Sequence, residues 1–551
     1  MHQGNTTFNT EEIEIHIRTY RSLLKSTGEV RIKQLEDSHL NMNSILQEKG
    51  KTDDVDIAAF IYVLLRLPFC MSNVKKIILG QSNDVFAKHG IRNFSRWQEV
   101  EAPGRRRKMF YDGKNTLAVY IASVTDVDDL ITLLTAFQIE WNKFHKSLKA
   151  AKDVVKEAGK FIDREDIDRV KNIWGEDFTS FLQAIKHRSA DFTVKLLSGS
   201  YVEYAKATKY WWKNIAAKIP FINFGNRPIY FVSSNTHSVT NLLTRFALQE
   251  EKTLQNFLYK SKDTNLIRLW EEIEMGDFLA NRENFLYYIA KKYGRTNPEF
   301  LKSKKEKEIR LGIHHIPAFH YLDIDAQVIE IKKLADIDLD KRLGITTAHL
   351  KKSNALIINI DYPLGWAAYQ VLTEIGQNVA SVRGIYLMGK AATLNGKVGD
   401  ILLPTTVFDQ HTKNIYGFNN SFNSLDFKDI FATGDVLDDQ KTIATKGTFL
   451  ESKDLIKRWF RQGYTIIEME TGPYLNALYE FVYYNRYTEN QFINLTNTPF
   501  ELGIAHYASD TPYSKAKNLG VRNLSYEGVE PTYAISLAII KKIVERETKE
   551  K

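Results

Sequence analysis

The sequence predicts an α/β C-terminal domain with a central mixed or parallel sheet, preceded by a mainly α-helical N-terminal region. Three observations support this fold class. Apolar residues recur at helical spacing through much of residues 1–220. At Arg227 the chain changes to a β-rich run followed by a polar turn. From about residue 351, short apolar runs alternate with amphipathic segments, which is typical of a sheet covered by helices.

The length of 551 residues exceeds what one ordinary core organises, so we expect more than one domain. We divide the chain into a helical region of no assigned role, a mixed α/β segment and the C-terminal domain, at residues 1–220, 221–345 and 346–551, with the first part of the C-terminal domain plus an insertion as the alternative for the middle segment. Within the first of these, helical spacing is clearest at residues 53–67, 130–144, 161–185 and 194–215.

Composition and charge exclude several classes of protein. The single cysteine, Cys70, rules out an internal disulfide and a Cys-based zinc site, and no histidine spacing matches a standard metal motif. The longest apolar run, IAAFIYVLLRLPFCM, is shorter than the roughly 20 residues of a membrane span and carries Arg66. The N-terminal residues show no signal peptide. We therefore expect a cytoplasmic protein with no metal and no membrane partner.

The one dense basic run is Arg105–Lys108, in the stretch APGRRRKMF. Between a Pro-Gly pair and an aromatic residue, such a run is typical of a solvated loop, with a phosphate or nucleic-acid contact as the alternative. The net charge of +8 is mild for this length, and no zinc-finger spacing or aromatic-and-basic interleaving accompanies the run. A nucleic-acid partner is therefore the least favoured expectation.

In the C-terminal domain we expect strands at ALIINI, RGIYLMG, DILLPTTVF, GYTIIEME and ELGIAHYASD, and helices at PLGWAAYQVLTEIG and PTYAISLAIIKKIVERE. Ligands of such sheets lie beyond the carboxyl ends of the strands. MGKAA, EME and SDTP all stand at predicted strand ends. Glu468 and Glu470 therefore fall where a site is expected, although a salt-bridged strand end would explain two acids equally well.

Four short motifs occur in order in about the last 200 residues: IDYPLGWAA, MGKAATLNGKVGDILLP, IIEMETG and ASDTP. With the weaker segment TKGTFLES, they resemble the nucleoside phosphorylase and nucleosidase superfamily, which includes purine nucleoside phosphorylase, methylthioadenosine nucleosidase and AMP nucleosidase. The resemblance implies a nucleoside phosphorylase-like fold for the C-terminal domain alone. It implies an enzyme that cleaves the N-glycosidic bond of a purine nucleoside or nucleotide, by phosphate or by water.

The resemblance also implies roles for individual residues. Glu470 would accept hydrogen bonds from the ribose hydroxyls, and Asp510 would be the general acid that protonates the purine as it leaves. Phe449 would stack on the base, although the same residue in another context reads as ordinary core. The residues implied to bind the substrate are Glu468, Met469, Phe449, Gly389, Lys390 and Ser509. These residue types suit the chemistry, because the ribose becomes oxocarbenium-like while negative charge builds on the purine.

Two features depart from the family pattern. In MGKAA, Lys390 stands where relatives place Ser, Thr or His, and Ala392 replaces a glycine. A lysine there either pairs with phosphate or excludes it, so phosphorolysis and hydrolysis both stay open. The family's first strand is not found directly before ALIINI, and RPIYFVSSNTHS, far upstream, is its best candidate. That assignment makes a phosphate- or water-handling loop of Ser233, Ser234, Asn235, Thr236 and His237.

The resemblance implies no cofactor, with inorganic phosphate as a co-substrate if the reaction is phosphorolysis. Relatives assemble as dimers, trimers or hexamers, so it also implies a homo-oligomer. AMP nucleosidase, with a long region ahead of its nucleosidase-like domain, is closest in outline. A hypothesis of a different class is a non-catalytic sensor that binds a nucleoside or nucleotide. The altered MGKAA loop favours the sensor, whereas the presence of both Glu470 and Asp510 favours the enzyme.

Overall fold

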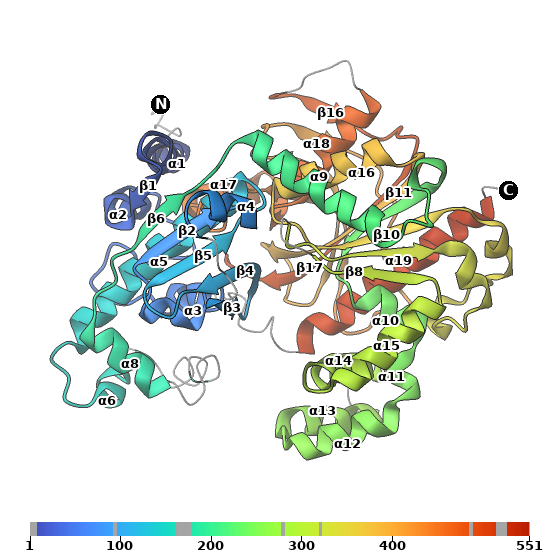
Figure 1. Cartoon of the computed structure of the whole chain (residues 1–551), viewed down its shortest axis with the longest axis horizontal. Coiled ribbons are helices and arrows are strands. Elements are labelled where there is room, and N and C mark those ends of the chain that lie inside the picture. Colours follow the sequence, from blue (N-terminus) through green and yellow to red (C-terminus); the bar gives the residue numbers. More distant parts are fainter. Residues whose placement is uncertain are drawn as a thin grey trace.

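The computed structural model describes residues 8–91, 96–160, 162, 171, 178–276, 281–318, 322–483, 489–513 and 526–549. These residues form two sheets, each packed with helices, that lie side by side (Figure 1). The first sheet and its helices come from residues 8–196, and the second sheet contains all the later strands. Among the described helices, none combines the length and apolar character that crossing a bilayer requires.

The N-terminal sheet has six strands in the order β1-β6-β2-β5-β4-β3. β2 runs parallel to β5 and β6, and the other three pairings are antiparallel. The strands are β1 (Glu29–Arg31), β2 (Lys76–Gly80), β3 (Gln98–Ala102), β4 (Arg105–Tyr111), β5 (Thr116–Tyr120) and β6 (Thr193–Leu196). Its helices are α1 (Phe8–Thr27), α2 (Glu36–Asn41), α3 (Ile57–Leu64), α4 (Asn83–Lys88), α5 (Val124–Leu148), α6 (Val154–Ala158) and α8 (Phe178–His187), and the next helix, α9 (Tyr201–Lys218), packs mainly on the second sheet.

The sequence analysis missed the N-terminal sheet, although helices still make up most of the regular structure of this region. Helices do lie in the expected segments 53–67, 130–144 and 194–215, as α3, α5 and α9, and segment 161–185 lies partly outside the described residues. The strands escaped the sequence analysis because they are short. The sequences of β2 and β5, KIILG and TLAVY, are continuous apolar runs, and without alternation such runs cannot be told from buried helix by periodicity.

The second sheet contains eleven strands in the described residues and is mixed, as the alternation after residue 351 predicted. Its order is β16-β13-β12-β14-β15-β11-β7-β10-β9-β8, and β17 pairs with β11 and β12. The strands are β7 (Pro228–Ser234), β8 (Ile313–Ile316), β9 (Ala326–Glu330), β10 (Leu356–Asp361), β11 (Ser381–Thr393), β12 (Ile401–Asp409), β13 (Ile415–Gly417), β14 (Val436–Ala444), β15 (Tyr464–Glu468), β16 (Phe492–Asn494) and β17 (Glu501–Asp510).

β7 lies at the centre of this sheet, parallel to both β10 and β11. The expected division at residue 346 therefore falls inside one sheet, because β7 precedes it and β10 follows it. Between β7 and β10 the chain adds strands β8 and β9 at the sheet edge and a group of helices (Figure 1). These helices are α10 (Ser238–Thr244), α11 (Phe246–Gln249), α12 (Glu251–Ser261), α13 (Thr264–Met275), α14 (Arg282–Thr296) and α15 (Pro298–Arg310).

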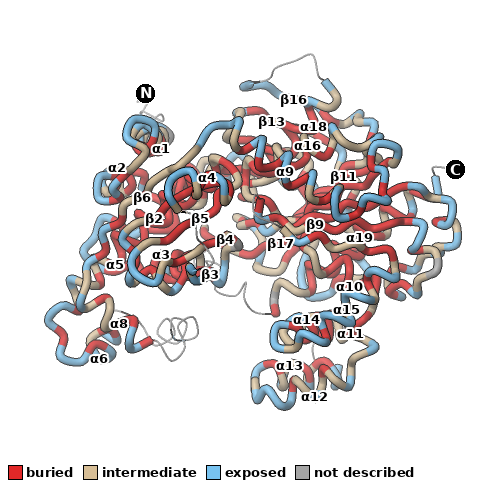
Figure 2. Tube along the Cα trace, viewed as in Figure 1, coloured by how far each residue is buried: buried red, intermediate tan, exposed pale blue. Residues whose placement is uncertain are grey.

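Helices cover both faces of the second sheet, and β7 shows why. Successive side chains of a strand point to opposite faces. Tyr230 and Val232 pack in one core with α10, α14 and α19 (Val529–Lys549), whereas Ile229 and Phe231 pack in another with α9, α16 (Ala367–Asn378) and α18 (Thr471–Val482). Buried residues accordingly run through the strands and the helices packed on them (Figure 2).

A third core joins the two sheets. It contains apolar residues from α1, α3, α5 and β2 together with residues of β14, β15, α17 (Lys453–Arg461) and the loop before α17. The contributions from the second sheet are Ile443, Phe449, Leu450, Leu455, Ile456, Trp459 and Ile467. The N-terminal sheet therefore packs against the part of the second sheet that carries the predicted site.

Candidate functional site

The predicted acidic segments meet across the end of β11. Ala392 of β11 lies opposite Ile467 of β15 on one side and opposite Asp510 of β17 on the other. Glu468 and Glu470 follow Ile467 directly, so the EME and SD segments come together although they are about 40 residues apart in the sequence. The sheet topology therefore places the ends of β15 and β17 on either side of the end of β11.

Glu468 is buried and organises the start of α18. Its Oε2 accepts hydrogen bonds from the amides of Glu470 and Thr471, both at 2.7 Å. Its Oε1 is buried and has no hydrogen-bond partner among the described residues. Burial, and to a lesser degree the charge of Glu470, raise the pKa of Glu468. The side chain thus holds the turn that presents Glu470 and keeps one oxygen atom available.

Glu470 is the N-cap residue of α18 and is half-buried. Its Oε1 accepts a hydrogen bond from the Gly365 amide at 3.2 Å. Burial raises the pKa of Glu470, while the Gly365 amide and the positive charge of Arg105 oppose that rise. Met469, between the two acids, is buried. The Glu470 carboxyl therefore titrates closer to neutrality than an exposed glutamate does.

Asp510 ends β17 and is half-buried. The Ser509 hydroxyl donates to its Oδ2 at 2.6 Å and has the Ala391 carbonyl as an alternative acceptor at 3.3 Å. Because Ala391 precedes the residue opposite Asp510, Ser509 also anchors the carboxyl to β11. Ser509, which the resemblance places with the substrate, thus has a role within the chain as well.

His506 is a site residue that the sequence analysis missed. It is buried in β17, and its Nε2 lies 3.2 Å from the Thr471 hydroxyl, the residue whose amide bonds Glu468. Burial lowers the pKa of His506 to about 4, so the ring is neutral at physiological pH. A Cβ at Gly389 would lie 2.7 Å from His506 Nδ1, which explains why the MGKAA segment, which is part of β11, needs a glycine there. One polar residue within the apolar strand ELGIAHYA was the available signal.

Phe449 and Lys390 occupy different environments. Phe449 is fully buried in the core that joins the two sheets. The centroid of its ring lies 5.9 Å from that of His39 and 5.7 Å from that of Tyr62. Both of these partners come from the N-terminal region. Lys390 is exposed on β11. A stacking role for Phe449 would therefore require these aromatic contacts to rearrange, and the contact of Lys390 with a ligand stays a prediction.

The predicted phosphate loop stands at the end of β7. The Tyr474 hydroxyl donates to Ser233 Oγ at 2.9 Å, and Ser234 donates to the Asn359 side chain at 2.7 Å. Asn235 Oδ1 accepts from the amides of His237 and Ser238, which caps α10. Thr236 accepts from Gln327 through its carbonyl. Ser233, Ser234 and Asn235 thus bond to the protein itself, and a phosphate contact of this loop stays a prediction.

The N-terminal region contributes directly to this part of the molecule. Arg105–Lys108 is not a solvated loop, because these residues belong to β4 and Arg107 is buried. Arg105 pairs with Asp129 at 2.6 Å, and Asp129 Oδ1 also accepts from the Thr448 hydroxyl at 3.1 Å. The basic run therefore lies against the segment that contains Phe449.

A second contact between the two parts holds Gly365, the residue that bonds Glu470. Thr125 Oγ1 accepts the Trp366 amide hydrogen at 3.0 Å. Gly365 has φ of +51°, and a Cβ there would lie 2.4 Å from Thr125 Cγ2. Since Thr125 lies in the first turn of α5, the N-terminal region fixes the loop whose amide reaches the Glu470 carboxylate.

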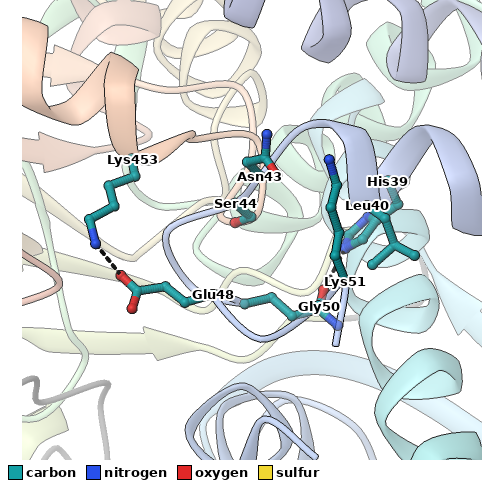
Figure 3. Close-up of a pocket in the computed structure, with 9 residues that line it drawn as sticks. His39, Leu40, Asn43, Ser44, Glu48, Gly50, Lys51 and Lys453 are labelled. Atoms are coloured by element: carbon teal, nitrogen blue, oxygen red, sulfur yellow. Dashed lines mark hydrogen bonds and ion pairs between the residues drawn. The ribbon is translucent and has the colours of Figure 1, made fainter. Parts of the chain in front are cut away.

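A pocket of about 270 Å³ lies beside Phe449 on the N-terminal side (Figure 3). The ion pair between Lys453 and Glu48, at 3.4 Å, spans one side of it. It does not include Glu470 or Asp510, so it is distinct from the meeting point of the strand ends. Its lining residues are His39, Leu40, Asn43, Ser44, Gln47, Glu48, Gly50, Lys51 and Lys453.

Comparison with known proteins gives one family match: the family described as "Family of unknown function (DUF6909)" matches residues 32–545. No curated protein matches the chain. Among solved structures, 5′-methylthioadenosine/S-adenosylhomocysteine nucleosidase from S. pneumoniae is similar to it, with 10% identity over 42% of this chain and 90% of that one, and a TM-score of 0.28.

Two further solved structures are similar at the same level. Isoform 2 of uridine phosphorylase from Schistosoma mansoni has 10% identity over 60% of this chain and 92% of its own, with a TM-score of 0.30. A futalosine hydrolase mutant of Helicobacter pylori strain 26695 has 10% identity over 59% and 98%, with a TM-score of 0.27. At such TM-scores, the assignment of the site depends on the residues of this chain.

Proposed function

Since the chain belongs to the family described as "Family of unknown function (DUF6909)", its activity has to be inferred from its own site, and we propose that it cleaves the N-glycosidic bond of a purine nucleoside or nucleotide. The observation that carries this proposal is the pairing of Ala392 with both Ile467 and Asp510. This pairing supports the proposal because β15, which leads into Glu470, and β17, which ends at Asp510, flank the same end of β11, and both acids are half-buried.

In this reaction the bond between C1′ of the ribose and N9 of the purine breaks, and its electron pair goes to the base. Asp510 gives a proton to N7, which neutralises the departing purine. Glu470 accepts hydrogen bonds from the ribose hydroxyls and stabilises the oxocarbenium-like sugar. The oxygen of water, or a deprotonated oxygen of phosphate, then bonds to C1′. The proton that water releases, or in phosphorolysis one taken up from solvent, restores the carboxylic acid of Asp510. General acid assistance of this kind is typically worth about 100- to 10,000-fold in rate.

Other residues hold this pair in place. Glu468 accepts the Glu470 amide hydrogen, and Thr471 links Glu468 to the neutral ring of His506. Gly365 donates to Glu470, so the N-terminal region reaches the site through the contact of Thr125 with the loop. We assign Glu468 and Met469 to the sugar side, with Gly389, Lys390 and Ser509 near them. The reaction we propose requires no cofactor, and its phosphate dependence decides between phosphorolysis and hydrolysis.

The second candidate is a sensor that binds a nucleoside or nucleotide without cleaving it. One observation favours it, namely that Phe449 is enclosed by His39 and Tyr62. A base stacked on Phe449 would displace rings of the N-terminal region, which is how a bound nucleoside would be signalled to that region. The enzyme is favoured because a sensor has no need of both Glu470 and Asp510.

The test is base release from a panel of purine nucleosides and 5′-nucleotides, with and without phosphate, for the wild type, Asp510→Asn and Glu470→Gln. Glu299→Gln, on the exposed face of α15, is the matched control. Release that falls at least 100-fold in both site variants, and is unchanged in the control, would establish the enzyme. Nucleoside binding without release from any substrate would establish the sensor instead.

A further inference from the structure

Three arginines form a group on the N-terminal side of the site: Arg66, Arg105 and Arg107. Arg107 donates to Asp126 and Asp129, both at 3.0 Å, and Arg105 pairs with Asp129 at 2.6 Å. Arg66 makes no ion pair within the described part of the chain. Its guanidinium lies 3.4 Å from the centroid of the Tyr62 ring and donates to the Tyr62 carbonyl. Asp126 and Asp129 therefore neutralise Arg105 and Arg107, whereas Arg66 has no carboxylate paired with it among the described residues.

This arginine group lies beside the proposed catalytic carboxyls. Burial raises the pKa of Glu470, and the charge of Arg105 opposes that rise. Burial raises the pKa of Tyr62, and the charges of Arg66, Asp510 and Arg105 all act on the same hydroxyl. The Tyr62 ring also meets Phe449 edge-on. Tyr62 thus lies between the arginines of one part of the molecule and Asp510 of the other.

Two of the arginines keep unused donors. Arg105 Nε and Arg107 Nη1 are buried, and neither has a hydrogen-bond acceptor among the described residues. A buried donor without an acceptor is costly, and native structures rarely keep one without a reason. Guanidinium groups match the oxygen atoms of phosphate in geometry and charge better than any other side chain does.

We propose that Arg66 and Arg105 bind a phosphate group at this site. The phosphate is either the 5′-phosphate of a nucleotide substrate or inorganic phosphate that acts as the attacking co-substrate. That the remainder of the ligand is a nucleoside rests on the proposed function. The loop Ser233–His237 is the less suitable phosphate site, since Ser233, Ser234 and Asn235 already bond to the protein.

Arg66→Gln is the first variant to make, because within the described residues the one hydrogen bond of this side chain goes to the carbonyl of Tyr62, in the helix that ends just before Arg66. Arg66→Lys keeps the charge, and Arg31→Gln, an exposed arginine on β1, is the charge-matched control. Calorimetry would measure binding of adenosine, guanosine, their 5′-monophosphates and inorganic phosphate. Base release from the same compounds would be followed in parallel, and thermal unfolding would show that each variant folds.

We expect Arg66→Gln to weaken binding of the phosphate-bearing compound about 10- to 100-fold, with nucleoside affinity unchanged and Arg66→Lys intermediate. Weaker binding of the monophosphates alone identifies a 5′-phosphate. A raised KM for inorganic phosphate, in a reaction that depends on it, identifies the co-substrate.

Equal loss for nucleosides and nucleotides would overturn the proposal, because Arg66 would then act only through Tyr62 and Asp510. Wild-type protein that binds none of the phosphate compounds would overturn it as well. Arg66-dependent nucleotide binding without base release would support the phosphate site and refute the proposed reaction. Base release whose rate is the same with and without inorganic phosphate, and the same for nucleosides and 5′-monophosphates, would support the proposed reaction and refute the phosphate site.

Discussion

Replacing Arg107 with methionine tests whether the buried charges of the N-terminal region hold the site together. Arg107 Nη2 lies 3.0 Å from both Asp126 and Asp129, and its side chain is 3% exposed. Removing one partner of a buried ion pair typically costs about 3 to 5 kcal/mol. We expect the lower end, about 3 kcal/mol, since Asp129 keeps Arg105 and Asp126 keeps two backbone amides.

The measurement is the free energy of unfolding from urea titration, compared with Arg31→Met. Arg31 pairs with Asp191 at 2.6 Å, but both side chains are largely exposed, so its loss should leave stability nearly unchanged. Higher salt should reduce any loss of stability caused by Arg31→Met, because exposed charges are screened, and should leave the loss caused by Arg107→Met unchanged. A loss below about 1 kcal/mol for Arg107→Met, or a salt-sensitive one, would refute the reasoning that these charges act as a buried network.

Two further substitutions test the contact between the two parts and the burial beside the pocket. Gly365→Ala forces a left-handed φ on alanine and drives its Cβ into Thr125, so we expect a loss of about 2 kcal/mol or more and slower base release. Adding Thr125→Ala to Gly365→Ala should recover part of that loss of stability. If the losses of the two single variants simply add in the double variant, the proposed clash would be contradicted. Burial raises the pKa of Glu451 from its usual 4.5 to about 8. The folded state therefore holds the proton more tightly than the unfolded state does. As a result, the free energy of unfolding falls as pH rises between these two values. Glu451→Gln should therefore stabilise the protein by about 2 to 4 kcal/mol at pH 9 and by almost nothing at pH 4, and a pH-independent effect would argue against the shift.

The elements of the second sheet were predictable where a local pattern coincided with a capping or strand-end signal. The runs ALIINI, DILLPTTVF and ELGIAHYASD became β10, β12 and β17 within about one residue at each end, and the closing amphipathic segment became α19. Because these runs are short and flanked by turn residues, their length and their flanking residues were enough to assign them as strands. RPIYFVSS was also correctly expected to be a strand, and the structure adds that it lies at the sheet centre.

Residues brought together only by tertiary packing could not be predicted. Tyr62 and Asp510 are separated by most of the chain, and no local pattern of either one refers to the other. Arg105–Lys108 looked solvated because the aspartates that neutralise it lie on α5. The motif resemblance indicated Glu470 and Asp510, which lie at the ends of β15 and β17, two strands that both pair with β11, but Phe449 is fully buried in the core that the N-terminal region shares.

That shared core has a consequence for how the chain is made. The N-terminal sheet leaves the ribosome first, yet one wall of its core consists of Phe449, Leu450, Leu455, Ile456 and Trp459, which are synthesised much later. Domains that are complete in sequence can fold as they emerge. Here the first 220 residues must wait, with apolar surface uncovered, until α17 has been translated. The nascent chain should therefore depend on chaperones for most of its synthesis, and a gene fragment that ends before residue 443 should yield aggregated protein.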